Sequence, residues 1–366
     1  MILRAISLTN FKNIASAQLE LSPKINGLLG NNGMGKSNLL DAIHYLSLTK
    51  SYGRLPDALL IKKDEDFAIV NGRYTRHGAE EEINVGLRRA GRKSFRRGGK
   101  EYKRLSEHIG LFPAVMVAPA DQNIITGSSE ERRRFIDMII SQTDAPYLGA
   151  LMRYNQALDQ RNRMLRDEIA DPLLYSAVEA VMADAAALIV QRRQEHIAAL
   201  TELFNSFYKR IAGDGEPVEI IYEQSGASSP SFSEALDERR QRDSILKYTS
   251  VGPHRDDITF LLDGMPVRQT ASQGQTKTFT IALRFAQYEF MARAIGRKPL
   301  LLLDDIFDKL DANRVERIIE VVSGEEFGQI FITDTNRKHL DEIMQRTGPD
   351  YRMFTVVHGE ISPIYC

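Results

Sequence analysis

The sequence has almost no cysteine and almost no net charge. Its single cysteine, Cys366, stands at the last of 366 positions, which excludes an internal disulfide framework and a multi-cysteine zinc site. A terminal residue without a special role is a simpler interpretation of Cys366 than a reactive thiol. The formal net charge is -1. A nucleic-acid-binding surface would therefore have to be a local cluster of Lys and Arg.

Long hydrophobic runs are also scarce. The first apolar segment is interrupted at Arg4 and lacks the features of a signal peptide. No stretch shows the roughly 20 apolar residues that a membrane-spanning helix requires, so we expect a cytoplasmic protein. Hydrophobic residues make up 43% and charged residues 27% of the chain. This is the balance of an ordinary globular protein, and the length suggests roughly two domains.

Strand and helix patterns divide the chain into three segments. Short apolar runs separated by turn residues predict strands at the start, and alternating strands and helices return near residue 249. Between them, residues 147–213 carry a continuous helical pattern with few Gly or Pro. We therefore predict an α/β fold, residues 1–110 and 248–366, that is split by a mainly helical inserted arm, residues 111–247.

A glycine-rich segment lies between a predicted strand and a predicted helix and fits G-x-x-x-x-G-K-S without a mismatch. Glycines let backbone N–H groups point at phosphates, and the helix N-terminus adds positive potential. In this pattern Lys36 contacts the β- and γ-phosphates, and the Ser37 hydroxyl ligates Mg²⁺. The alternative is a chance glycine-rich turn. We predict an ATP-binding loop made of Gly30, Asn31, Asn32, Gly33, Met34, Gly35, Lys36 and Ser37.

An unbroken apolar run, residues 299–303, ends in two acids, Asp304 and Asp305. This is the pattern of a strand buried on both faces, and α/β folds place ligand chemistry at the carboxyl ends of such strands. We predict that Asp304 holds Mg²⁺ and that Asp305 polarises the attacking water, the Walker B arrangement. The alternative is a solvated strand end, which the complete phosphate loop in the same chain disfavours.

Four residues before a long predicted helix resemble the ABC signature motif, most commonly L-S-G-G-Q. A hydroxyl side chain and a glycine at a helix N-terminus form an anion site. The resemblance implies a head-to-tail dimer in which the motif of one subunit caps the γ-phosphate bound by the other. An N-capped helix without a ligand is the alternative. The motif residues are Ser272, Gln273, Gly274 and Gln275.

Further motifs resemble the RecF family of SMC-like ATPases. They are residues 10–13 after the first strand, the segment 127–137 with Arg132, Arg133 and Arg134, and the segment 252–257. The resemblance covers residues 1 to about 360 in unchanged order. It implies that Lys12, Asn13 and Asn38 join the nucleotide site and that Leu310 and Asp311 form the D-loop at a dimer interface.

The resemblance also implies a function. Members of the family are expected to be weak, DNA-linked ATPases that use ATP and Mg²⁺ and form ATP-dependent homodimers. It implies binding to single-strand gaps and duplex junctions without sequence specificity, a partnership with RecR, RecA loading in gap repair and a link to the SOS response. From the sequence pattern alone we derive no role for His254 and Arg255. Gln122 is a candidate magnesium contact.

A basic stretch within a predicted strand-loop region is the best candidate for DNA contact. Clustered Lys and Arg release counterions from phosphates even when the whole chain is neutral, and no base-reading motif is present. A solvated hairpin is the alternative, and Arg132 to Arg134 could equally form ion pairs with neighbouring acids. The predicted DNA-binding residues are Arg88, Arg89, Arg92, Lys93, Arg96 and Arg97, together with Arg54 after the first helix.

Other classes of P-loop protein fit less well. A transporter ATPase subunit has a histidine where this chain has Asp334. A small-molecule kinase needs no signature motif. A nuclease of the overcoming-lysogenisation type, another SMC-like ATPase, has an acidic nuclease module that does not follow the predicted head.

Overall fold

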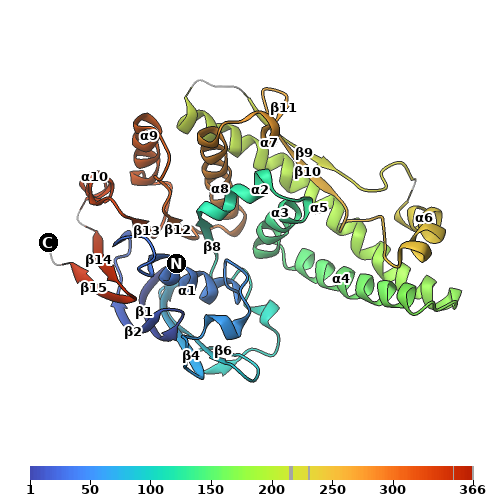
Figure 1. The fold of residues 1–366 in the computed structure, drawn as a ribbon, viewed down its shortest axis with the longest axis horizontal. Helices are drawn as coiled ribbons and strands as arrows, with labels where there is room; N and C mark the ends of the chain where they lie inside the picture. Colours follow the sequence, from blue (N-terminus) through green and yellow to red (C-terminus); the bar gives the residue numbers. More distant parts are fainter. Residues whose placement is uncertain (214–216, 230, 349, 365–366) are drawn as a thin grey trace. The chain divides into compact units, whose positions relative to one another are not determined.

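The computed structural model describes residues 1–213, 217–229, 231–348 and 350–364, and Cys366 lies outside them. The chain forms two compact units (Figure 1). The head unit comprises Met1–Asp121, Phe207–Gly213 and Lys277–Cys366, and the arm unit comprises Gln122–Ser206 and Asp214–Thr276.

The first sheet of the head unit is antiparallel. Its strand order is β2-β1-β4-β5-β6-β7. One face carries buried apolar side chains such as Leu8, Ala68 and Val85, and polar residues alternate with them on the other face, as expected for a half-buried sheet. The strands are β1 (Ile2–Phe11), β2 (Ile14–Glu20), β4 (Phe67–Arg76), β5 (Ala79–Arg88), β6 (Ser94–Arg97) and β7 (Lys100–Glu101).

The second sheet of the head unit is mixed. Its order is β15-β14-β3-β13-β12-β8, with parallel pairing from β14 to β8 and an antiparallel edge at β15. In Figure 1 the blue strand β3 therefore lies among red strands from the end of the chain. The strands are β3 (Ile25–Leu29), β8 (Ala114–Val117), β12 (Leu300–Asp304), β13 (Ile330–Asp334), β14 (Tyr351–Val357) and β15 (Glu360–Ile364).

Helix α1 (Lys36–Leu48) lies between the two sheets and contacts strands of both. Ten of its thirteen residues are buried, so it fills the core of the head unit. The long helix α8 (Gln273–Ile295) begins at the predicted signature motif, five residues before the helix start expected from the sequence. The remaining helices of this unit are α9 (Ala312–Ser323), α10 (Arg337–Thr347) and the 3₁₀ turns η1 (Asp57–Leu60), η2 (Leu105–Glu107) and η3 (Pro119–Asp121).

The arm unit is mainly helical and also contains a three-stranded antiparallel sheet, β11-β10-β9. The helical pattern over 147–213 is not one helix, because the chain breaks before Pro172, a residue that favours the first turn of a new helix. Its elements are α2 (Gln122–Thr126), α3 (Ser129–Thr143), α4 (Ala145–Arg166), α5 (Pro172–Ala212), α6 (Phe232–Leu246), α7 (Val267–Thr270), β9 (Val218–Glu223), β10 (Asp257–Leu262) and β11 (Met265–Pro266).

The division into units differs from the predicted boundaries at 110 and 248. Strand β8 pairs with β12, so the head unit extends to Asp121. Strands β10 and β11 pair with each other and, through β10, with β9, so the arm unit extends to Thr276. Both differences come from strand pairing between distant parts of the chain, which a local pattern does not contain.

Among the described residues, helix α5 alone is long and apolar enough to cross a membrane by length and composition. Glu179 and Asp184 interrupt its apolar stretch, so the expectation that no stretch reaches about 20 apolar residues is not contradicted. Buried residues recur every three or four positions, at Tyr175, Val178, Met182, Ala186 and Ile189. This is the pattern of a helix that packs one face against a protein core.

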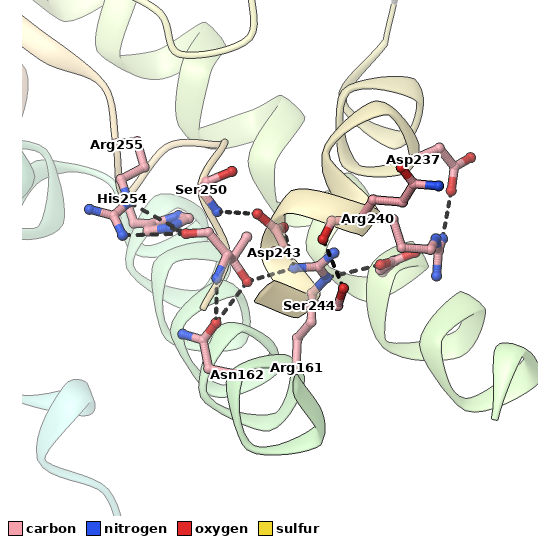
Figure 2. A network of polar contacts seen from close by, with 12 residues as sticks. Arg161, Asn162, Asp237, Arg240, Asp243, Ser244, Ser250, His254 and Arg255 are labelled. Atoms are coloured by element: carbon pink, nitrogen blue, oxygen red, sulfur yellow. Dashed lines mark hydrogen bonds and ion pairs between the residues drawn. The ribbon is translucent and has the colours of Figure 1, made fainter. Parts of the chain in front are cut away.

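A buried guanidinium joins three helices of the arm unit (Figure 2). Arg161 on α4 is fully buried and donates to Glu179 on α5 and to Asp243 on α6, at 2.9 and 2.8 Å. It also donates to the Thr249 hydroxyl. Because each charge has a partner, the network links the helices without leaving an unpaired charge in the interior.

Candidate nucleotide-binding site

The predicted phosphate loop connects β3 to α1 at the carboxyl end of the mixed sheet. Gly33 and Gly35 have positive φ angles of 79° and 112°, which side chains other than glycine rarely adopt. Gly35 is the N-cap of α1 and offers no side chain to its first N–H groups. The first hydrogen bond of the helix runs from the Asn38 N–H to the Gly35 carbonyl at 3.0 Å, so the N–H groups of Lys36 and Ser37 precede it. Such a loop and helix end would suit an anion, as predicted.

Lys36 is buried and folds back over the loop. Its Nζ donates to the carbonyl oxygens of Gly30 and Asn31, at 2.5 and 3.0 Å. Burial lowers the pKa of this ammonium, and the carboxylates of Asp305 and Asp304 act in the opposite direction. Since its hydrogen bonds among the described residues go to neutral carbonyls, this ammonium would attract anionic phosphate oxygens.

Asn13 supports the loop from outside. Its side-chain amide donates to the Met34 carbonyl at 3.1 Å and accepts from the Asn38 amide at 2.7 Å. A Cβ on Gly35 would lie 2.7 Å from the Asn13 amide and would displace it, and the φ angle of 112° also favours glycine here. Lys12 forms an ion pair of 2.6 Å with Asp41 of α1. The structure thus brings Asn13 and Asn38 to the loop, whereas Lys12 contacts the middle of α1.

Asp304 lies beside Ser37, as the two motifs predict. The Ser37 hydroxyl donates to the Asp304 carboxylate at 2.9 Å, and the Thr333 hydroxyl donates to the same oxygen at 2.8 Å. Burial raises the pKa of Asp304, and these two hydrogen bonds oppose that rise. The sequence analysis did not single out Thr333. Thr333 lies on β13, directly opposite Asp304. Polar residues at the carboxyl ends of neighbouring parallel strands were therefore the sequence signal that could have identified it.

Asp305 follows the strand in a left-handed conformation with φ 49°. Its backbone N–H donates to the Thr333 hydroxyl at 3.0 Å. Burial and the neighbouring Asp308 raise the pKa of its carboxyl group, whereas Lys277 and Lys36 lower it. A carboxyl group with a raised pKa is a better proton acceptor near neutral pH than an unperturbed one.

Lys277 is a second residue that the sequence analysis did not assign. Its buried ammonium donates to the backbone carbonyls of Asp305, at 3.3 Å, and Asp308. It stands on α8, two residues after the predicted signature motif, and therefore joins that helix to the loop that carries Asp305.

The oxygens at this site suit magnesium. Mg²⁺ is commonly held by one or two carboxylates together with substrate phosphates and waters, rather than by a cage of protein ligands. Asp304 and Ser37 supply a carboxylate and a hydroxyl side by side. Among the described residues no group of three or more His, Cys, Asp or Glu that could hold a metal ion is present.

Asp334 ends the strand next to β12, where transporter ATPases have a histidine. It bonds a histidine instead: His339 Nδ1 lies 2.8 Å from Asp334 Oδ2, and the His339 ring packs on Phe307. The Asp334 carboxylate also accepts from the Asn336 N–H. His339 lies five residues further along the chain, on α10, so strand alignment alone did not reveal it.

The predicted signature motif forms a closed helix cap. The Gln275 N–H donates to the Ser272 hydroxyl at 3.2 Å, and the Ser272 N–H donates to the Gln275 side chain at 2.9 Å. This reciprocal pair is a capping box. Ser272 and Gln273 are exposed, and Gly274 follows in the first turn of α8.

The predicted D-loop residues precede α9. Asp311 is the N-cap of this helix, and its carboxylate accepts from the Arg314 N–H at 3.0 Å. The side chain remains more than half exposed. The Leu310 N–H donates to the Phe307 carbonyl at 3.4 Å, which closes a turn before the helix.

Comparison with known proteins identifies the family. The RecF/RecN/SMC N terminal domain matches residues 2–356. A protein of Parabacteroides distasonis named DNA replication and repair protein RecF is 50% identical over 364 residues, which cover 100% of both chains. The chain belongs to the RecF family. The RecF protein of Bacteroides fragilis is 48% identical over 366 residues, covering 99% of this chain and 98% of that relative.

Solved structures extend the RecF comparison to the fold. The recombination mediator protein RecF with ATP, of the RecFOR pathway, is 30% identical with a TM-score of 0.88 over 100% of this chain and 98% of that one. An SMC head domain of Pyrococcus furiosus is 17% identical with a TM-score of 0.58, over 99% and 96% of the two chains. The latter shows a shared fold alone. The predicted ABC-type α/β head with an inserted arm is confirmed.

The RecF-type segment 127–137 does not leave its three arginines free. Arg132 forms an ion pair with Asp257 at 2.8 Å, and Arg133 donates to the Asp256 carbonyl at 2.7 Å. Only Arg134 pairs with near neighbours, Glu130 and Glu131, as the sequence analysis considered. Arg132 and Arg133 therefore hold the RecF-type segment 252–257 in place, although Arg132 and Asp257 are 125 residues apart in the sequence.

His254 and Arg255 of that segment have different environments. The His254 ring lies 2.7 Å from the Tyr154 hydroxyl and 3.0 Å from the Thr249 carbonyl, and burial lowers its pKa to about 4. It is a neutral structural residue. Arg255 is exposed and lies over the Tyr248 ring at 4.8 Å. Gln122 begins α2 at the start of the arm unit.

The residues of the predicted basic stretch fall into two groups: those with partners inside the protein and those exposed around a hollow. Lys93 pairs with Asp57, Arg97 pairs with Glu81, and Arg89 donates to the carbonyls of Glu65 and Lys62. Arg54 is exposed in a turn after α1, at φ 57°. The remaining predicted residues, Arg88, Arg92 and Arg96, are exposed around one hollow on the outer face of the antiparallel sheet.

Proposed function

We propose that the chain is an ATP-dependent DNA-binding recombination mediator. In this proposal it binds ATP and Mg²⁺ at the phosphate loop and hydrolyses ATP slowly. It acts with RecR in the cytoplasm during gap repair, RecA loading and the SOS response. The observation that carries the proposal is the contact of Ser37 with Asp304, with Asp305 next in the chain. Membership of the RecF family supports the DNA-repair role.

The residues of the site divide the work on ATP. The loop N–H groups and Lys36 would hold the phosphates. Asp304 and Ser37 would hold Mg²⁺, which neutralises charge on the β- and γ-phosphates when it is bound. Asp305, whose pKa is raised by burial, would orient the attacking water and accept its proton.

Two exposed elements support a head-to-tail homodimer. The capped N-terminus of α8 presents Ser272 and Gln273 to solvent, and Asp311 before α9 is more than half exposed. A γ-phosphate held between the loop of one subunit and the α8 N-terminus of the other would favour the dimer with ATP and not with ADP. The nucleotide would then shift the population of the DNA-binding state by its different affinity for the two states.

The test is size-exclusion chromatography with light scattering. Wild type, Lys36→Met and the control Lys63→Met, an exposed lysine of the same unit, are each run without nucleotide, with ADP and with ATP, in the presence of a gapped duplex. We expect ATP alone to produce a DNA-retaining dimer of wild type and Lys63→Met, and no such dimer of Lys36→Met. A wild-type protein that binds ATP but stays monomeric and ignores DNA would contradict the proposal.

A further inference from the structure

The outer face of the antiparallel sheet is hollowed at its β4–β5–β6 end. The hollow has a volume of about 850 Å³. Ile69, Gly86 and Ser94 form a cross-strand row in its floor, because Ile69 lies opposite Gly86 and Gly86 lies opposite Ser94. The two small residues give the hollow its depth: a Cβ on Gly86 would meet only the Ser94 side chain within 4 Å.

The rim of this hollow is strongly basic. Arg88, Arg92 and Arg96 are exposed, and no acceptor for their guanidinium groups is recorded in the part of the chain that the structure describes. Two acids, Asp66 and Glu101, also line it. The excess of positive charge favours an anionic occupant.

Two apolar side chains face solvent beside these arginines. Phe67 is 44% exposed and Ile69 is 36% exposed. Phe67 lies directly opposite Arg88 on the neighbouring strand. An exposed aromatic ring next to guanidinium groups is the combination that binds single-stranded nucleic acids, since bases stack on the ring while the cations contact phosphates.

The middle of this face carries side-chain amides. The Asn84 amide donates to Asn71 at 3.1 Å, and the Asn71 amide donates to the Ser7 hydroxyl at 3.2 Å, a polar ladder across three strands. Asn71 and Asn84 both line the hollow. Amide groups next to an apolar floor can meet the polar edges of bases whose faces stack on that floor.

A single strand suits this surface better than the other anionic candidates. A duplex buries the faces of its bases, so it would gain nothing from Phe67 and Ile69. A peptide that adds a strand needs unpaired backbone groups at a sheet edge. Strands β4 and β5 each have neighbours on both sides, so the hollow offers side chains only.

We infer that this hollow binds unpaired bases of a DNA strand, with Phe67 as the stacking platform and Arg88, Arg92 and Arg96 as phosphate contacts. The inference rests on the proposed DNA binding and specifies which part of a gapped substrate this face holds. It assigns separate roles to the ring and to the arginines, and these roles are measurable separately.

The chain contains no tryptophan, so Phe67→Trp places a single indole in the hollow. We expect its fluorescence to be quenched by an oligodeoxythymidine of about twelve nucleotides and not by a blunt duplex, because only unpaired bases stack on it. The control is Ile221→Trp, at an apolar strand residue of the arm unit with a similar exposure of 41%. Its fluorescence should respond to neither DNA.

Binding constants supply the second measurement. Phe67→Ala should weaken oligodeoxythymidine binding by about 5- to 100-fold and leave duplex binding unchanged. Arg88→Gln should weaken both and reduce the slope of log affinity against log salt by roughly one phosphate contact. Phe67→Ala is compared with wild type for ATP binding, which confirms that the variant is folded.

Three results would overturn the inference. Equal losses on single-stranded and duplex DNA would mean that the hollow contacts phosphates alone. No loss on either DNA would mean that it does not bind DNA. Quenching of Phe67→Trp by polyglutamate but not by the oligonucleotide would identify an acidic protein partner instead. If wild type retains a gapped duplex with ATP in these cases, only this inference fails; if wild type binds no DNA at all, the proposed function fails with it.

Discussion

The nucleotide site of the head and the arginine network of the arm differ in how their charged residues are paired. In the head, the hydrogen bonds of Lys36 among the described residues go to backbone carbonyls, and Asp304 accepts from two hydroxyls. Neither group is paired with a guanidinium in that part of the chain, so phosphates and a metal would meet them without displacing an arginine. In the arm, Arg161 and Arg193 are buried against carboxylates of the same unit. These two guanidinium groups therefore bind carboxylates of the protein itself instead of a ligand.

The arm contacts show how complete this internal pairing is. Arg193 on α5 bonds Asp137 of one RecF-type segment and both Asp256 and the Pro253 carbonyl of the other. Arg132 bonds Asp257. A family motif therefore indicates ligand chemistry in one unit and architecture in the other. What separates the two cases is whether each charge already has a partner of opposite sign.

The largest expected effect on function comes from Asp305→Asn. Asn keeps the shape of the side chain but cannot accept a proton, so ATP turnover should fall by about 100- to 10,000-fold. ATP binding should persist, because the phosphate contacts of Lys36 are untouched. The unfolding free energy should not fall, since burial already disfavours the charged form of Asp305. Turnover is measured by phosphate release and binding by a fluorescent ATP analogue.

The matched control is Asp308→Asn, which removes a nearby, exposed carboxylate and keeps the carbonyl that Lys277 contacts. Its turnover should stay close to that of wild type. An equal loss in both variants would show that negative charge in this loop, rather than a base at Asp305, controls hydrolysis.

The next largest effect is on stability and concerns the arm. Arg161→Met leaves Asp243 and Glu179 without their buried partner, so the unfolding free energy should fall by about 3–5 kcal/mol. Arg240→Met is the control, because Arg240 also bonds Glu179 but is 41% exposed, and its loss should stay under about 1 kcal/mol. Urea denaturation measures both. Similar losses in the two variants would remove the distinction between buried and exposed partners.

The sequence predicted that Ser37 and Asp304 meet in the head because the signals for this contact are local or follow a simple rule. The phosphate loop is contiguous, and Asp304 meets Ser37 because parallel strands place their carboxyl ends at one edge. Thr333, Lys277 and His339 were missed because each reaches the site from another element through a side chain. For Lys277 and His339 the neighbouring residues in the sequence carry no sign of these contacts, whereas for Thr333 the polar end of its strand was a usable signal.

The arm was predicted less well for the same reason. The partners of Arg132 and Arg133 lie more than a hundred residues away. The strand pairing that moves the boundary to Thr276 is equally distant. The break before Pro172 was the exception, since an Asp-Pro pair inside a helical pattern is a local signal that the continuous-helix interpretation passed over.

The smallest predicted effect tests the arm network through a proton. His254 contacts the Thr249 carbonyl, and Thr249 accepts from Arg161 through its hydroxyl, so the ring belongs to the network shown in Figure 2. Burial lowers its pKa to about 4, Arg255 and Arg133 add to that shift, and Asp243 opposes it. The unfolded chain has the ordinary pKa of about 6.5.

Because the folded pKa is below the unfolded one, His254 contributes stability that is fully present above pH 6.5 and is lost as the pH falls toward 4. One proton corresponds to a slope of at most about 1.4 kcal/mol per pH unit. His254→Gln should remove this part of the slope, whereas His44 and His108, whose pKa values burial also lowers to about 4, keep theirs in the head. Urea denaturation from pH 7 to 4.5 measures the difference. If His254→Gln keeps the wild-type slope, the folded arm does not hold the His254 ring neutral. The internal pairing of charges in the arm would then not extend to this histidine.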